Sequence, residues 1–243
     1  MSFRTMHARI ACVVSLVALV CILAPSHVFS DKLEGHGAVV RKVMADAHKS
    51  GLLKKVAGGE ASDEEKGKLL EAYVMMWEAP NPAGDAKSWT DKTGDLMISA
   101  ARMVLGEEGA AASLEKTSSC GGCHKAHKRK RVRLSVREAP HVFLTDAKAK
   151  YTIKEVMKVG HKGGLLEKVQ KGEASKEEKK KLLDLYISMW ESKPSKGELH
   201  SWKKLSGNLI AAAAKAVLEK EGAADALKAA SNCGGCHKSH KGE

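Results

Sequence analysis

The sequence predicts an all-α protein built from two tandem antiparallel four-helix bundles. Two observations support this fold class. The chain contains one pattern written twice, and each copy has four segments whose apolar residues recur at helical spacing. At 243 residues the chain is long enough for two domains of roughly 100 residues each. An offset of 113 residues pairs Met44 with Met157, His48 with His161, Tyr73 with Tyr186, Trp77 with Trp190, Trp89 with Trp202, and Cys120 with Cys233.

The first predicted helix of each copy runs through Val39–His48 and through Ile153–His161. Glycine is a common stop signal for a helix, and it stands at Gly51 in the first copy and at Gly163 in the second. A short helical segment is expected to follow each stop.

The second predicted helix begins with a capping box, in which the Ser62 hydroxyl and the Glu65 carboxylate each bind a free backbone N–H group. Its apolar residues from Leu69 to Trp77 recur at helical spacing, and Pro80 ends it. The second copy has the same pattern, with Ser175, Glu178 and Pro194.

The third predicted helix begins near Trp89 and continues through an alanine-rich segment to Leu105. The fourth begins just after Gly109 and carries two cysteines at its end. Four amphipathic helices joined by short loops are the pattern of an antiparallel four-helix bundle. The corresponding residues of the second copy are Trp202, Leu218 and Gly222.

The first thirty residues are typical of an export signal, because Arg4 and Arg9 precede an apolar run from Ile10 to Ala24. A run of this length is short for a membrane span, which needs about 20 residues. We therefore expect a periplasmic or otherwise exported protein, with an uncleaved membrane anchor as the alternative. The predicted organisation is a signal at 1–30, domains at 31–128 and 141–243, and a basic linker at 129–140.

The chain is basic, with 41 Lys and Arg residues against 29 Asp and Glu residues. Removal of residues 1–30 leaves 39 basic and 29 acidic residues, a formal charge of +10. Such a charge favours acidic protein partners or an anionic membrane surface, although it also serves solubility alone. Nucleic acid is not an expected partner for an exported protein.

Two C-x-x-C-H motifs carry the chemistry of this sequence. Cysteines three residues apart on a helix lie about one turn from each other, so both thiols can reach the vinyl groups of one porphyrin. This pattern is the attachment signature of c-type haem. A zinc site would have to join pairs in different repeats, and a thioredoxin-like site would need a strand–helix–strand pattern. The expected cofactors are two covalently bound haems, held by Cys120, Cys123, Cys233 and Cys236, with His124 and His237 as proximal iron ligands.

The two copies resemble the class II cytochromes c, four-helix bundles with the attachment motif near the C-terminus. A tryptophan at the start of the third helix and the Met157-Lys158 pair also match that family. The resemblance implies that Met44 and Met157 are the distal iron ligands. His48 and His161 lie one helical turn away and are the competing donors. An open distal site is the third possibility.

The function expected from these observations is transfer of single electrons between redox partners, without enzymatic activity. Two alternatives are a gas-binding protein for NO or CO, which requires an open distal site, and a dihaem peroxidase. The chain departs from the family after each motif, where His127-Lys128 and His240-Lys241 replace an aromatic residue and an arginine. These two histidines are expected to cap the last helix or to approach a haem propionate.

Overall fold

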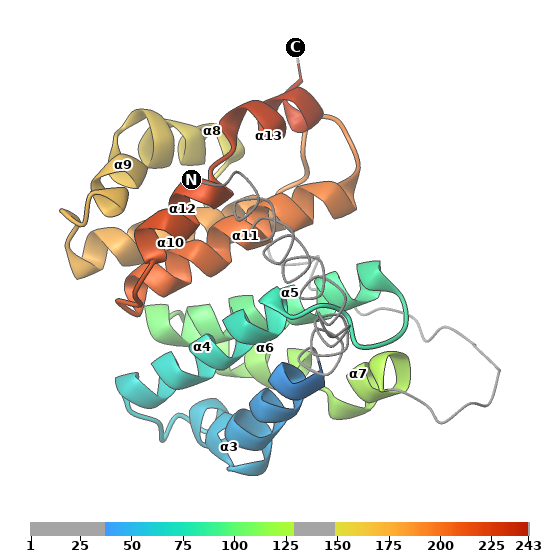
Figure 1. Cartoon of the computed structure of the whole chain (residues 1–243). Coiled ribbons are helices and arrows are strands. Elements are labelled where there is room, and N and C mark those ends of the chain that lie inside the picture. Colours follow the sequence, from blue (N-terminus) through green and yellow to red (C-terminus); the bar gives the residue numbers. More distant parts are fainter. Residues whose placement is uncertain (1–36, 129–148, 243) are drawn as a thin grey trace, which may run out of the picture. The chain divides into compact units, whose positions relative to one another are not determined.

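A computed structural model describes residues 37–128 and 149–242, and every regular element in these ranges is a helix (Figure 1). The prediction of an all-α protein is confirmed for this part of the chain. The predicted export signal and basic linker lie outside the described residues. From Val39 onward the chain forms one compact unit.

The two copies contain the same succession of helices. The first copy has a helix over residues 37–43 that continues as π-helix η1 (Met44–Lys49), then α3 (Leu52–Ala57), α4 (Asp63–Glu78), α5 (Ala86–Leu105), α6 (Ala110–Thr117) and α7 (Cys120–His127). The second has α8 (Ile153–Val156), π-helix η2 (Met157–Lys162), α9 (Leu165–Gln170), α10 (Lys176–Glu191), α11 (Leu199–Val217), α12 (Ala223–Ala230) and α13 (Cys233–His240).

Local sequence signals place the long helices as predicted. At the start of α4 the backbone N–H of Glu65 donates to the Ser62 hydroxyl at 3.2 Å, and the N–H of Ser62 donates to the Glu65 carboxylate at 2.9 Å. The equivalent capping box begins α10. Both helices end before a proline, because proline offers no backbone N–H group to continue the helix.

The expected fourth helix is interrupted in both copies, which corrects the prediction of one continuous helix. In the first copy α6 ends at Thr117 and α7 begins at Cys120. Thr117 donates to the carbonyl oxygen of Ser113 at 2.9 Å. In the second copy Asn232 accepts from the N–H of Gly235 at 3.0 Å and so caps a new helix. Hydroxyl and amide side chains compete with the helical backbone for hydrogen bonds, and they favour a break here.

The core is mainly aliphatic, as the low aromatic content implies. The largest fully buried side chains include Leu and Met residues together with Tyr73 and Tyr186. Met76 and Met189 are 1% and 2% exposed, so both side chains fill the core.

The two copies contact each other through α4 and α5 of the first copy and α10 and α11 of the second. The rings of Trp77 and Trp190 meet edge to face, with centroids 5.7 Å apart. Each tryptophan lies on a glycine of the other copy. A Cβ atom added to Gly94 would be 2.2 Å from the Trp190 ring, and one added to Gly207 would be 2.4 Å from the Trp77 ring. Since Trp77 and Trp190, and likewise Gly94 and Gly207, occupy equivalent positions, the contact is reciprocal, as in a twofold-symmetric dimer interface.

Two of the four ion pairs between the described parts of the copies follow the same reciprocity. Arg102 pairs with Glu191, and the equivalent Lys215 pairs with Glu78. The buried pair of Lys203 with Asp91 has no counterpart, because the equivalent residues are Thr90 and Lys204. The pair of Lys220 with Glu71 has none either, because the equivalent residues, Glu107 and Asp184, are both acidic. The interface is therefore symmetric in its apolar centre and asymmetric in two polar pairs.

The same interface contains a carboxyl group, that of Asp95, which destabilises the fold when it is ionised at neutral pH. Burial raises the pKa of Asp95 from its usual 3.8 to about 6, although Lys203 and a hydrogen bond from Trp190 oppose the shift. A folded-state pKa above the unfolded value means that the protonated carboxyl stabilises the fold at low pH. This stabilisation is lost as the pH rises from about 4 to about 6. At neutral pH the ionised Asp95 therefore weakens the fold.

Asp95→Asn is expected to stabilise the protein above pH 6, by about 3 kcal/mol at most. The equivalent position of the second copy already holds Asn208, which accepts a hydrogen bond from Trp77 in the same way. Urea unfolding of wild type and variant at pH 4 and pH 8 measures the effect, with the exposed Glu60→Gln as control. An equal difference between variant and wild type at the two pH values would contradict the assignment.

Candidate functional site

The two C-x-x-C-H motifs form short helices, α7 and α13, that begin at the first cysteine of each motif. All four motif cysteines are free thiols. Cys120 and Cys233 are exposed, whereas Cys123 and Cys236 are half-buried and pack against the hydrophobic core. Burial raises the pKa of the Cys123 and Cys236 thiols, so they stay protonated at neutral pH. Each motif thus presents one thiol to solvent and one to the protein.

A buried histidine ties the end of each motif helix to the loop before the third long helix. In the first copy His127 Nδ1 lies 2.8 Å from the carbonyl oxygen of Ala83, and Nε2 lies 3.1 Å from the Ser88 hydroxyl. Its ring meets the Trp89 ring edge to face, at 5.3 Å. Both ring nitrogens have partners, so this histidine positions the helix and does not cap it. The second copy has the same arrangement, with His240, Lys196, Ser201 and Trp202.

Glycine is required where this loop passes the motif helix. Gly84 has a φ of 81°, in the left-handed region, and a Cβ atom there would lie 2.3 Å from the carbonyl oxygen of Ala126. Gly197 repeats this geometry against Ser239, at 2.4 Å. The contact fixes the motif helix against the body of each copy.

The first helix of each copy contains a π-helical segment, which is wider than an α-helix. The segments Met44–Lys49 and Met157–Lys162 are both π-helical. A π turn is rare and takes one residue more than an α turn, so it changes which side chains share a face; such turns are frequent at functional sites. Met44 and Met157 begin these segments and are half-buried against the core.

His48 and His161 lie within the π-helical segments and face a tyrosine of the second long helix. His48 Nε2 is 3.4 Å from the Tyr73 hydroxyl, and the two ring centroids are 5.9 Å apart. The rings of His161 and Tyr186 are also 5.9 Å apart. In this second pair, His161 Nε2 and the Tyr186 hydroxyl are buried without a hydrogen-bond partner among the described residues.

Electrostatic effects connect this pair to the motif helix. Burial lowers the pKa of His48, and the nearby His124 lowers it further. His161 responds in the same way to burial and to His237. The pKa of Tyr73 is raised by burial and by Cys120. The histidine of the π-helical segment, the tyrosine and the C-x-x-C-H motif of a copy therefore belong to one cluster.

The donor set of this cluster fits a haem c. Haem iron receives four bonds from its porphyrin, so the protein needs to supply only one or two further ligands. His124 and His237 are exposed, and each lies on the same motif helix as its two thiols. The lowered pKa keeps His48 and His161 neutral, which is the form of imidazole that binds a metal. The unpartnered, buried Nε2 of His161 is such a donor.

The structure brings some of the residues that the sequence predicted for the site close to the motifs and, within the described ranges, shows no such contact for others. The motif histidines His124 and His237 lower the pKa of His48 and His161, whereas Met44 and Met157 stand at the start of the same π-helical segments. Tyr73 and Tyr186 were not predicted as site residues. Their identical separation of 25 residues from His48 and His161 is the sequence signal that could have indicated them.

Comparisons with known proteins add no further assignment. No protein-family model, curated protein or solved structure matches the chain. Among residues 37–128 and 149–242, no group of three or more His, Cys, Asp and Glu side chains could by itself hold a metal ion. Within the same ranges, no helix has the length and apolar character that a membrane span needs.

Proposed function

We propose that the chain is an exported dihaem c-type cytochrome that passes single electrons between redox partners and has no enzymatic activity. The main support for this proposal is that the same cluster of residues occurs in both copies. In each copy an attachment motif, a neutral, half-buried histidine and a buried tyrosine interact. Chance duplication of an unrelated cysteine pair does not account for the histidine that faces each motif.

The proposed arrangement is two four-helix bundles of the class II cytochrome type. In the first copy the four helices are the 37–49 segment, α4, α5, and the α6–α7 pair, and contacts between these elements support the grouping. The interrupted fourth helix differs from the continuous helix predicted from the sequence pattern. It places the attachment motif on a short helix of its own.

Each residue of the cluster has a defined role in this proposal. The two thiols of a motif hold the haem, and the histidine that follows binds the iron. When bound, the haem supplies an iron that gains and loses one electron. The protein contributes the axial ligands and an apolar surrounding, and these set the reduction potential. The basic surface favours acidic redox proteins as partners, and it is compatible with association at an anionic membrane surface.

For the distal ligand we propose His48 and His161 in preference to Met44 and Met157. The motif histidine of each copy lowers the pKa of His48 or His161, so these imidazoles lie near the motif. They are also neutral, so no proton has to leave before iron is bound. The buried Nε2 of His161 has no hydrogen-bond partner among the described residues, so it is available as a donor to iron.

Spectra of the ferric protein test this assignment. We expect both haems to be low-spin, without the weak far-red sulfur-to-iron band of a Met-ligated haem. His48→Ala combined with His161→Ala should convert both haems to a high-spin form that binds carbon monoxide. Met44→Leu combined with Met157→Leu is the matched control and should leave the spectrum low-spin.

Two outcomes would contradict parts of the proposal. A far-red band that disappears in the methionine double variant would establish methionine as the distal ligand. A native protein that is already high-spin and binds carbon monoxide rapidly at both haems would replace electron transfer by gas binding.

A further inference from the structure

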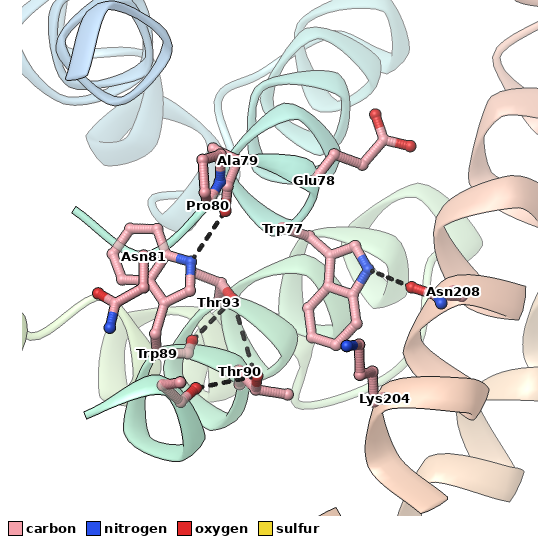
Figure 2. Close-up of a pocket in the computed structure, with 11 residues that line it drawn as sticks. Trp77, Glu78, Ala79, Pro80, Asn81, Trp89, Thr90, Thr93, Lys204 and Asn208 are labelled. Atoms are coloured by element: carbon pink, nitrogen blue, oxygen red, sulfur yellow. Dashed lines mark hydrogen bonds between the residues drawn. The ribbon is translucent and has the colours of Figure 1, made fainter. Parts of the chain in front are cut away.

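A cavity of about 460 Å³ lies where the end of α4 and the start of α5 meet α11 of the other copy (Figure 2). Its volume is within the range of small-molecule sites, roughly 300–1,000 Å³. Trp77 and Trp89 supply apolar walls, and Thr90, Lys204 and Asn208 supply polar groups. The cavity belongs to neither haem-attachment motif, so it is independent of the function proposed above.

The second copy shows what occupies the equivalent space. There the side chain of Lys203, which corresponds to Thr90, places its ammonium 4.9 Å from the centre of the Trp190 ring. The same ammonium lies 3.3 Å from the carboxylate of Asp91, which corresponds to Lys204. Lys203 and Asp91 are 7% and 6% exposed. In this half of the interface, the ion pair of Lys203 with Asp91 therefore occupies the space next to the Trp190 ring.

The cavity beside Trp77 has the ammonium group of Lys204, from the second copy, but the described residues that line it offer no free carboxylate to pair with it. Lys204 is exposed at the cavity and forms no ion pair among the described residues, and Thr90 is shorter than the lysine that it replaces. Glu78, which also lines the cavity, is paired with Lys215. The group that would complement Lys204 is therefore an anion.

The amide of Asn208 points to the same ligand chemistry. Trp77 Nε1 donates to Asn208 Oδ1 at 3.1 Å, as Figure 2 shows. Because an indole N–H can only donate, the amide oxygen is the acceptor, and the amide NH₂ group remains as a donor. Lys204 and Asn208 both offer hydrogen-bond donors at this side of the cavity, beside two indole rings.

We propose that this cavity binds a small planar aromatic carboxylate. The ring packs against the indoles of Trp77 and Trp89, where aromatic pairs are favourable. The carboxylate accepts charge-assisted hydrogen bonds from Lys204 and a hydrogen bond from the Asn208 amide. The ligand replaces the pair that Lys203 and Asp91 form in the second copy.

Isothermal titration calorimetry of the purified protein with 1-naphthoate tests the proposal. We expect one site per chain, with an affinity that weakens as salt is added, because Lys204 is exposed. The uncharged 1-naphthamide should bind about tenfold more weakly, because it lacks the charge-assisted contact. No binding of naphthoate, or equal binding of the amide, would overturn the assignment to an anionic ligand.

The repeat provides matched variants. Thr90→Lys combined with Lys204→Asp imports the polar pair of the second copy, which the fold already accommodates there, and should abolish naphthoate binding. Lys203→Thr, Asp91→Lys and Asp95→Asn together make the opposite exchange, because Asp95 corresponds to Asn208, and should raise the stoichiometry to two sites per chain. Unchanged far-ultraviolet circular dichroism checks the fold of both variants. Unaltered naphthoate affinity in the first variant would place the ligand elsewhere and overturn the proposal.

Discussion

Replacement of Cys120 and Cys123 by serine is expected to remove one haem from the chain and to leave the other in place. Serine is close to cysteine in size but cannot form the thioether bonds that hold haem c. The second copy has its own pair of thiols, on α13, and its own facing histidine. Intact-mass spectrometry should therefore show the loss of one haem mass, and the pyridine haemochrome absorbance should fall by half. The matching double variant of Cys233 and Cys236 should give the same result.

Ser119→Ala is the control for this experiment, since it alters the residue next to the motif without changing a thiol. A wild-type chain that carries no covalent haem would contradict the central proposal. So would a chain whose thiols are oxidised to disulfides or bound to zinc in the native state. Loss of both haems in one double variant would indicate that the second copy depends on the first for its maturation.

Trp190→Ala is expected to lower the free energy of unfolding by about 3–5 kcal/mol, the usual cost of truncating a buried tryptophan. Trp190 is 5% exposed and touches both Gly94 and Trp77 of the other copy. It also lies beneath the buried ammonium of Lys203. Truncation would remove this packing and leave a cavity between the copies. Urea unfolding followed by circular dichroism measures the loss.

Leu199→Ala provides the control for this change, because Leu199 is 42% exposed and its truncation should alter stability by less than about 0.5 kcal/mol. The wild type should unfold in one transition, since the two copies share a buried interface. A cost below about 1 kcal/mol for Trp190→Ala, or two well-separated transitions in the wild type, would contradict a cooperative contact between the copies.

Much of the helical framework follows from short-range sequence signals. The capping boxes at Ser62 and Ser175 and the prolines that follow α4 and α10 act on backbone groups only a few residues away. The repeat offset likewise predicts that each helix of one copy recurs at the equivalent position in the other copy. These features need no knowledge of the rest of the molecule, because the groups that interact are close in sequence.

The sequence contains a signal for the interruption of the fourth helix, but the break was not predicted from it. Polar residues stand at the break in both copies, as Thr117 to Ser119 and as Ser231-Asn232. Each can bind the backbone in place of a helical hydrogen bond, yet such residues also occur within helices. The outcome depends on packing against α5 and α11, which local patterns do not describe.

The attachment motif and the candidate ligands were determined by sequence, but the choice among the ligands was not. Met44 and His48 are four residues apart and would share one face of an α-helix. The π-helical turn alters that relation. Burial of His48 beside Tyr73, together with the charge of His124, then distinguishes the two side chains. Each of these effects depends on residues at least 25 positions away in the chain.

The sequence by itself therefore determined an all-α chain with two equivalent copies and the bounds of its long helices to within a few residues. It also contains the two C-x-x-C-H motifs and the candidate ligands on which the proposed function rests. Only the tertiary structure decided that Trp77 and Trp190 pack between the copies, that one buried ion pair breaks the symmetry there, and that the histidines face the motifs. The physical reason is the range of the interactions. Caps and helix ends arise from neighbouring residues, whereas desolvation and the packing of a tryptophan on a glycine 96 or more residues away arise only when distant segments meet.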